Sequence, residues 1–441
     1  MIEAIKFRMK VMRIDQKEGY AMKKITFAIL GMGNRGTAYA AKQLKYPEEM
    51  EIVAMADTRR IRLDAANKYL HLPESSLYDS AEAILAQPKL ADVMIIATQD
   101  AQHKEHALRA MELGYDLLLE KPISNKLEDI TVIAKAAEEL GRKVFVCHVL
   151  RYTVFYQQIK KLIEQGVIGK VESVEAAEHV GCHHYAHSFV RGNWHNEAAS
   201  SPMILAKCCH DMDIILWLTG KNCLKVNSFG SLDYFKAENC PAEATERCVD
   251  CPLPCPFHAN RYYASRVPGW PTNILHPEPT QENITEVLAA TNYGKCVFKM
   301  DNDVVDHQTV HMLLEDGVTV TFQMLGFTNR QTRTIRIVGT EGELWGDFKD
   351  NKLYYQRFCE DVQMIDMKTL CDDFTGHGGG DARLVYDVVR YLRGDEFDTS
   401  SMTVIDRSVE SHYLAFAAEA SRVMGGELLK LDDFKKKIGA I

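Results

Sequence analysis

Hydrophobic residues in the first third of the chain form short runs that alternate with segments of helical composition. The runs are rich in Ile, Leu, Val and Phe, which is typical of strands buried on both faces. They cover residues 24–30, 51–56, 92–97, 115–119 and 143–148, and the helical segments cover 37–44, 64–70, 103–113 and 127–140. This alternation predicts an α/β fold whose doubly wound parallel sheet has helices on both faces, as in Rossmann domains.

After about residue 148 the pattern changes to a period of two, which is typical of antiparallel strands with one buried face. Such stretches cover 170–179, 291–300, 309–325 and 333–338, and helices are expected at 155–165, 203–218, 382–392 and 409–423. Residues 235–285 contain many Cys and Pro and little periodicity, so we expect a loop-rich insertion there. We therefore predict an extension at 1–21, a Rossmann domain at 22–147 and a second α/β domain at 148–441.

Composition and charge narrow the function further. The 441 residues are 46% hydrophobic and 26% charged, and the formal net charge is -9. These values are typical of a globular protein with two or three domains, and they argue against a basic nucleic-acid-binding surface. The sequence has no apolar run of roughly 18 residues, so we expect no membrane span.

The segment at 22–30 resembles a short signal peptide because two lysines precede an apolar stretch. A buried first strand explains it better, since the stretch runs directly into a glycine-rich loop that cleavage would destroy. We therefore expect a cytoplasmic protein, and Met22 could be an alternative start.

The glycine-rich loop has the pattern G-x-G-x-x-G and follows the first strand directly. Such a loop lets the backbone approach a pyrophosphate, and the helix that it opens offers free N–H donors to the anion. Asp57 ends the next strand, where a carboxylate would bind the adenosine ribose hydroxyls. Arg59 could accept a 2′-phosphate, but the acid would repel it, so we favour NAD over NADP. The alternative is three ordinary loop glycines and a helix-capping Asp57. The expected cofactor residues here are Gly31, Gly33, Asn34, Arg35, Gly36, Asp57, Thr58 and Arg59.

The tripeptide Glu120-Lys121-Pro122 stands at the carboxyl end of the fourth expected strand, the edge where ligands bind in such sheets. A single lysine there would usually be an ordinary surface residue. Together with the upstream glycine loop, however, the tripeptide resembles the signature of the glucose–fructose oxidoreductase / inositol dehydrogenase / MocA (Gfo/Idh/MocA) family. The segment after the third strand resembles that family's loop along the cofactor, and its candidate residues are Thr98, Gln99 and His103. The resemblance covers most of the chain from residue 24.

The resemblance implies a second domain with a large, mostly antiparallel open sheet, whose free face often forms a homodimer or homotetramer. It also implies hydride transfer between a nicotinamide cofactor and a carbinol carbon of a sugar, glycoside or polyol. Some branches use the same oxidation transiently to cleave a glycosidic bond. We therefore expect an NAD-dependent oxidoreductase with a small carbohydrate substrate. A redox-neutral lyase or glycosidase and a non-catalytic nucleotide sensor are the alternatives.

The expected helix at 203–218 holds candidate catalytic side chains. Lys207 and His210 share one helical face. Hydride removal from a carbinol requires a base for the hydroxyl proton, which suits His210, while the Lys121 ammonium would stabilise the developing alkoxide. The family resemblance implies Asp-x-x-x-His in this helix, but Ala206 replaces the carboxylate, so Lys207 could bind a substrate hydroxyl or carboxylate instead. The alternative is that His210 only caps buried polar groups.

Polar and aromatic side chains near this helix could contact a sugar. Five histidines lie between residues 179 and 195, but their spacing includes no H-E-x-x-H, so a sugar-binding loop explains them better than a metal site. Trp194 would stack on a ring face, and neighbouring Arg, Asn and His side chains would bind hydroxyls. The candidate substrate residues are Arg151, His184, Arg191, Asn193, Trp194, Asp306, His307 and His377.

The insertion contains Cys240, Cys248, Cys251 and Cys255, whose spacing on Pro-containing turns is compatible with a structural zinc. Such a metal would hold a segment that has little core of its own. Free thiols and a disulfide are the alternatives that the sequence leaves open.

Overall fold

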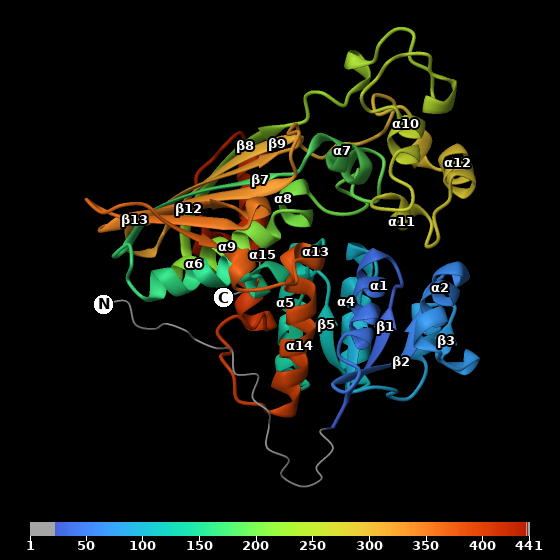
Figure 1. Cartoon of the computed structure of the whole chain (residues 1–441), viewed down its shortest axis with the longest axis horizontal. Coiled ribbons are helices and arrows are strands. Elements are labelled where there is room, and N and C mark those ends of the chain that lie inside the picture. The colour runs from blue at the N-terminus through green and yellow to red at the C-terminus, as the bar shows by residue number, and fades with distance from the viewer. Residues whose placement is uncertain (1–22, 438, 440–441) are drawn as a thin grey trace.

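The first third of the chain folds into a six-stranded parallel sheet with the order β3-β2-β1-β4-β5-β6. The computed structural model describes residues 23–437 and 439, so the predicted extension at 1–21 lies outside the described residues. The strands are β1 (Ile25–Leu30), β2 (Met50–Ala56), β3 (Leu77–Tyr78), β4 (Val93–Ile96), β5 (Asp116–Leu119) and β6 (Val144–Val146). They are connected by α1 (Asn34–Ala40), α2 (Arg60–Leu70), α3 (Ala81–Leu85), α4 (His103–Glu112) and α5 (Leu127–Glu139). The central strands are buried because helices cover both faces of the sheet, which confirms the predicted Rossmann fold (Figure 1).

Most of the remaining chain builds a nine-stranded sheet with the order β14-β13-β12-β11-β7-β10-β9-β8-β15. All neighbouring strands pair antiparallel except β7 and β10, so the predicted large, mostly antiparallel sheet is confirmed. Its strands are β7 (Val171–His179), β8 (Cys223–Ser231), β9 (His307–Leu314), β10 (Thr319–Leu325), β11 (Thr332–Gly339), β12 (Gly342–Asp347), β13 (Lys352–Arg357), β14 (Gln363–Asp366) and β15 (Leu429–Lys430). Helices α6 (Val154–Glu164), α9 (Cys209–Thr219) and α15 (Ile405–Val423) pack against one face of this sheet (Figure 1).

Late segments of the chain return to the Rossmann sheet and complete its core. Helix α14 (Gly380–Arg393) buries Leu384, Val385 and Val388 in the same hydrophobic cluster as the β1 side chains. The Thr403 carbonyl accepts a hydrogen bond of 2.8 Å from the backbone N–H of Val146 at the edge strand β6. The two parts of the chain therefore share one packed interface, and the ligand edge of the parallel sheet faces the second sheet.

Two expected elements differ in the structure. Residues 291–300, expected as a strand, hold only a short turn (Asn292–Gly294), because this segment pairs with the insertion through the bridge between Arg247 and Lys295. The helix expected at 203–218 breaks into α8 (Met203–Ala206) and α9, with two non-helical residues between them.

The insertion has more structure than its composition indicated. It contains α10 (Ala259–Ala264), α11 (Thr272–Leu275) and α12 (Gln281–Ala290). These helices enclose a small hydrophobic core of Cys248, Ala259, Tyr263, Leu275, Ile284 and Leu288. The remaining helices are α7 (Cys182–Tyr185), α13 (Thr375–Gly378) and α16 (Leu431–Lys437). Among the described residues, no helix is both long and apolar enough to cross a membrane.

Candidate active site

The glycine loop between β1 and α1 has two positions that only glycine fits. Gly31 has a φ of +87°, and a Cβ there would lie 2.6 Å from a backbone carbonyl of the loop after β4. A Cβ on Gly36 would lie 1.9 Å from the Gly31 carbonyl oxygen, so Gly36 allows α1 to pack on the loop. Gly33 is different, because a Cβ there would meet only the Arg62 guanidinium, at 3.8 Å. The loop is therefore approachable from the side of Gly33, where α1 begins.

Asp57 follows β2 and lies directly against this loop. Its carboxylate accepts hydrogen bonds of 2.8 Å from the backbone N–H groups of Met32 and Arg59. The Arg62 guanidinium lies 3.3 Å from the same carboxylate, a contact that the sequence did not indicate. Thr58 is exposed beside it. An acid and a cation therefore stand together at the point where the glycine loop meets α2.

His103, an expected cofactor residue, instead joins two loops. Its Nδ1 lies 2.8 Å from the Pro122 carbonyl oxygen, and its Nε2 lies 3.2 Å from the Thr98 carbonyl oxygen. The His103 side chain is fully buried, whereas Gln99 is exposed at the start of the turn before α4. His103 therefore fixes the loop after β4 against the turn after β5, and Gln99 is the side chain that stays open to a ligand.

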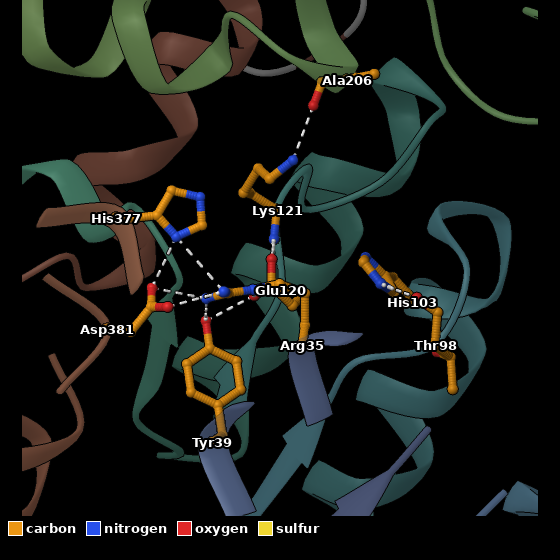
Figure 2. A network of polar contacts seen from close by, with 9 residues as sticks. All are labelled: Arg35, Tyr39, Thr98, His103, Glu120, Lys121, Ala206, His377 and Asp381. Atoms are coloured by element: carbon orange, nitrogen blue, oxygen red, sulfur yellow. Dashed lines mark hydrogen bonds and ion pairs between the residues drawn. The ribbon is translucent and has the colours of Figure 1, made fainter. Parts of the chain in front are cut away.

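Arg35 is engaged in a buried polar network rather than in the glycine loop (Figure 2). Its guanidinium donates to Glu120 at 2.7 Å and to the two carboxylate oxygens of Asp381, each at 3.0 Å. Glu120 also accepts the Tyr39 hydroxyl at 2.6 Å and the backbone N–H of Lys121 at 3.0 Å. Burial raises the pKa of the Glu120 carboxyl, but the charges of Arg35 and Lys121 outweigh burial and the pKa is lowered. The network thus holds an ionised Glu120 that fixes the backbone of Lys121.

Lys121 and His210 come from different parts of the chain and approach one another at the break between α8 and α9. Lys121 Nζ donates to the Ala206 carbonyl oxygen at 2.8 Å (Figure 2). His210 lies in the first turn of α9 and is buried. Burial lowers the pKa of His210 well below its usual value, and the charge of Lys121 lowers it further. The His377 ring lies 6.1 Å from the His210 ring, and its Nδ1 lies 3.0 Å from Asp381. At the ligand edge of the parallel sheet, the Lys121 ammonium therefore contacts the chain four residues before His210, and its charge acts on a neutral imidazole.

Two more buried histidines lie behind His210. The His148 ring is 5.7 Å from the His210 ring and 5.3 Å from the His412 ring. On α15, His412 Nε2 accepts the backbone N–H of Ile123 at 3.0 Å, and its Nδ1 donates to the Ser408 carbonyl at 3.0 Å. Burial lowers the pKa of His412 to about 3. His412 therefore ties α15 to the turn after β5, and no sequence motif pointed to it.

Lys207 stands in the break before α9 and belongs to a buried cluster of charges. Its Nζ lies 3.5 Å from Glu178. The Arg333 guanidinium connects Glu178, at 2.6 Å, with Asp211, at 2.8 Å. Burial raises the pKa of Asp211 to about 6 although the charge of Arg333 acts in the opposite direction. The cluster pairs two cations with two carboxylates, and its members Lys207 and Asp211 flank His210 in the chain.

Comparisons with known proteins agree with this architecture. Residues 25–148 match the family profile described as "Oxidoreductase family, NAD-binding Rossmann fold", and residues 160–403 match "Oxidoreductase family, C-terminal alpha/beta domain". The chain belongs to the Gfo/Idh/MocA oxidoreductase family.

Relatives in this family span several functions. The putative oxidoreductase YteT of Bacillus subtilis is 24% identical over 398 residues, covering 83% of this chain and 88% of that protein. The D-glucoside 3-dehydrogenase of Escherichia coli is 27% identical over 156 residues, covering 35% of this chain and 43% of that protein. The WlbA dehydrogenase of Bordetella pertussis, solved with NADH and UDP-GlcNAcA, has a TM-score of 0.66 at 19% identity, covering 93% of this chain and 99% of that one. At this identity the last similarity shows the shared Gfo/Idh/MocA fold.

Two arginines predicted to bind substrate are engaged elsewhere in this Gfo/Idh/MocA chain. Arg151 is buried and donates to both carboxylate oxygens of Asp213, at 2.7 and 2.5 Å. Arg191 is buried against the insertion, where it donates to the Lys295 and Phe257 carbonyl oxygens at 2.8 and 2.7 Å. Both arginines thus hold parts of the chain together through Nε and Nη2, which favours a structural role over the predicted role as sugar ligands.

The other predicted substrate residues divide into two groups. Asp306 is buried just before β9 and accepts two backbone N–H groups, which gives it a structural role, while His307 Nδ1 lies 2.8 Å from its carboxylate and the His307 side chain is half-exposed. Trp194 donates its indole N–H to Asp100 at 3.2 Å, and Asn193 is exposed. His184 is half-buried, and the charge of Lys207 adds to the desolvation that lowers its pKa. Only His184 and His377 are therefore placed close to the catalytic candidates.

The structure does not support the predicted zinc. Among the described residues, no group of three or more His, Cys, Asp or Glu side chains is arranged to hold a metal ion. Cys240, Cys248, Cys251 and Cys255 are all free thiols. The physical reason is that the insertion has its own hydrophobic core, which holds its helices together without a metal.

Proposed function

We propose that this protein is an NAD-dependent oxidoreductase that moves a hydride between nicotinamide and a carbinol carbon of a sugar, glycoside or polyol. The observation that carries the proposal is the contact of the Lys121 ammonium with the chain just before His210, at 2.8 Å from the Ala206 carbonyl oxygen. The contact lies outside the carboxyl ends of the parallel strands, where ligands bind in such sheets. Similarity to a D-glucoside 3-dehydrogenase supports a carbohydrate substrate.

The residues of the glycine loop fit a dinucleotide. The open side at Gly33 lets a pyrophosphate approach the backbone, while Gly36 keeps the N-terminus of α1 close to it. We assign Asp57 to the adenosine ribose hydroxyls, and its carboxylate would repel a 2′-phosphate, so NAD is preferred over NADP. We assign Gln99 and Thr58, both open to the loop region, to further cofactor contacts. When bound, the nicotinamide ring supplies hydride acceptance and return.

His210 is the proposed acid and base. Its imidazole is neutral because burial lowers its pKa. Its Nδ1 is enclosed and has no hydrogen-bond partner among the described residues, which leaves Nε2 to take the hydroxyl proton of the substrate. Lys121 donates to the same oxygen and stabilises the negative charge that develops there. We assign His377, His184 and Lys207 to the other hydroxyl groups of the substrate.

A redox-neutral reaction is the second candidate. In it the sugar is first oxidised to a keto-sugar, the group on the glycosidic oxygen then leaves by elimination, and the hydride finally returns from the cofactor to the sugar. Contacts between the insertion and the Rossmann domain next to Asp57 favour it, because a cofactor that stays bound can be recycled in each turnover. The two candidates share the first step and the same catalytic residues.

A panel of sugars, glycosides and polyols tests the proposal through NADH absorbance. A dehydrogenase accumulates NADH in proportion to substrate, whereas the redox-neutral enzyme consumes substrate without net NADH. Lys121→Ala and His210→Ala should each lower turnover by at least about 100-fold and leave the affinity for NADH within twofold. Lys126→Ala, at the exposed residue before α5, is the matched control and should keep full activity. Unchanged turnover in both catalytic variants would instead support a nucleotide sensor.

We further propose that the open face of the nine-stranded sheet forms a homodimer or homotetramer. This face carries a shallow groove lined by Thr321, Gln323, Arg336, Trp345 and Tyr354, among others. The Trp345 and Tyr354 rings stack there at 5.7 Å. Light scattering on the purified protein tests this, and a strict monomer at micromolar concentration would contradict it.

A further inference from the structure

The insertion reaches across to the Rossmann domain on the side of α2, next to Asp57. Arg59 Nη2 donates to the Leu275 carbonyl oxygen at 3.4 Å. Lys68, further along α2, forms an ion pair with Glu278. Both contacts join the region of α2 to residues 275–278, which begin at the end of α11. Figure 1 shows α10, α11 and α12 on the same side of the molecule as α2, between it and the far end of the insertion.

Tyr293 lies on this side of the site and is held from the insertion. Its ring stacks on His187 at 5.0 Å with an interplanar angle of 24°. It also meets Tyr263, a member of the insertion core, edge-on at 6.3 Å. Burial raises the pKa of the Tyr293 hydroxyl, and the charges of Arg62 and Arg59 act against that rise. The aromatic ring of Tyr293 is therefore held on the side of the molecule where Arg59 precedes α2 and Arg62 lies in its first turn.

Arg62 connects this tyrosine with the glycine loop. Its guanidinium lies 3.3 Å from the Asp57 carboxylate, and it is the group that a Cβ on Gly33 would meet at 3.8 Å. Asp57 and Arg62 therefore border the approach to the loop at the point where an adenosine ribose would lie, and the charge of Arg62 reaches Tyr293. Asp57 and Arg62 come from the Rossmann domain, whereas Tyr293 lies in the segment that follows the insertion and packs on its core residue Tyr263.

We propose that the insertion, with the segment that closes it, forms the outer side of the adenosine site through residues 275–278 and Tyr293, and that it slows release of the dinucleotide. The inference rests on the proposed function only in requiring NAD(H) at the glycine loop. Release requires the dinucleotide to pass Tyr293 or the insertion to separate from α2. The contacts with α2 are partly exposed, so each affects the rate of release only a few-fold. They do not touch the catalytic residues, so the hydride transfer step is unaffected.

Stopped-flow fluorescence tests the proposal, with NADH bound to the whole protein and displaced by excess ADP-ribose. We expect Tyr293→Ala to release NADH about tenfold faster and Glu278→Lys about threefold faster. The exchanged pair Lys68→Glu with Glu278→Lys should return the rate to that of the parent, because the ion pair is restored. Glu286→Lys is the matched control, since Glu286 is exposed on α12 and forms no ion pair among the described residues, and it should leave the rate unchanged. Equilibrium binding should weaken equally for ADP-ribose and NADH and not for reduced nicotinamide mononucleotide.

The outcomes separate this inference from the proposed function. Release at the parental rate in both Tyr293→Ala and Glu278→Lys overturns the inference, as does an equal acceleration by Glu286→Lys. If Tyr293→Ala does not fold, the exchanged charge pair decides the question, because Lys68 and Glu278 lie at the surface. A panel of sugars without any turnover removes the proposed function, but the release rates still test the insertion.

Discussion

At the scale of single residues, the hydrogen bond between His412 and Ile123 joins groups that are 289 positions apart in the sequence. We expect His412→Leu to leave a buried N–H without a partner, which costs about 1–3 kcal/mol in the free energy of unfolding. Turnover should also fall, because the turn that carries Lys121 loses an anchor. His412→Gln, whose side-chain oxygen can accept the same bond, should retain more of both. Urea unfolding and kcat measure the two effects, and a loss of stability with unchanged kcat would restrict His412 to a structural role.

Buried neutral histidines should make the stability depend on pH. Burial lowers the pKa of His148 and His210 well below the usual value, and it lowers that of His412 to about 3. The unfolded chain takes up these protons below a pH of about 6.5, so the stability is fully present above that pH and is lost as the pH falls toward the folded pKa values. Each such histidine contributes about 1.4 kcal/mol per pH unit. The folded pKa of Asp211 is raised to about 6. Below that pH the folded state binds a proton at Asp211 more readily than the unfolded chain does, which offsets part of the loss of stability.

Urea unfolding at pH values of about 7.5, 6.5 and 5.5 measures this dependence. The free energy of unfolding should change little over the first interval and fall over the second. His412→Gln should show a smaller fall because one titrating group is removed. A free energy that stays constant down to the lowest of these pH values would contradict the neutral state of the buried imidazoles.

The sequence predicted the placement of Gly31, Gly36, Asp57 and Lys121, because each belongs to a motif with its own local geometry. The sequence could not predict that Arg151 pairs with Asp213, because Asp213 lies in another helix and only the packed structure brings the two side chains together. An arginine near a site has the same sequence context whether it binds a substrate or a buried carboxylate. The same argument applies to Arg191 and Asp306, whose partners are backbone groups of distant loops.

At the scale of elements, the loop between β1 and α1 contains one glycine that the fold requires, Gly36, and one that we assign to cofactor binding, Gly33. Gly36→Ala places a Cβ 1.9 Å from a backbone oxygen, so we expect a clearly lower melting temperature. Gly33→Ala meets no backbone atom within 4 Å and has a φ of -71°, so the fold should keep its stability. The added methyl group would nevertheless stand where a pyrophosphate approaches, and NADH affinity should fall by about tenfold or more. Thermal unfolding and NADH fluorescence titration distinguish the two variants, and strong NADH binding by Gly33→Ala would contradict the assignment of the loop.

Helices and strands were predicted correctly where the hydrophobic residues of a segment follow a single period. The prediction was wrong where packing against another part of the chain changes the backbone conformation of the segment. The helix expected at 203–218 has an unbroken apolar pattern, yet it opens before α9 and presents the Ala206 carbonyl to Lys121. The segment at 291–300 alternates as a strand would, but it has no neighbouring strand because it closes the insertion through its pairing with Arg247. Periodicity records which side chains are buried, and it does not record which backbone is available to pair with them.

At the scale of the whole molecule, the change of pattern at about residue 148 does not separate two independent domains, because the late part of the chain completes the Rossmann domain. Helix α14 contributes Leu384 and Val388 to the core of the Rossmann sheet, and Asp381 at its start pairs with Arg35 of α1. The same Arg35 binds Glu120, which fixes the backbone of Lys121. The late part of the chain thus holds the catalytic turn in place, and a cofactor domain separated at residue 147 would lack both the helix and the carboxylate.

Removal of the Asp381 carboxylate tests this coupling. Asp381→Ala leaves the partly buried Arg35 with Glu120 as its remaining carboxylate, so we expect a loss of about 2–3 kcal/mol in the free energy of unfolding. Turnover should fall as well. Without Asp381, Arg35 no longer holds Glu120 in a fixed position, and the hydrogen bond of Glu120 with the backbone N–H of Lys121 weakens. Asp372→Ala is the matched control, since Asp372 is an exposed aspartate shortly before α13. Urea unfolding with kcat for the best substrate of the panel measures both effects. If Asp381→Ala and Asp372→Ala behave alike, the catalytic turn is held by the Rossmann domain alone and α14 serves only to cover its hydrophobic core.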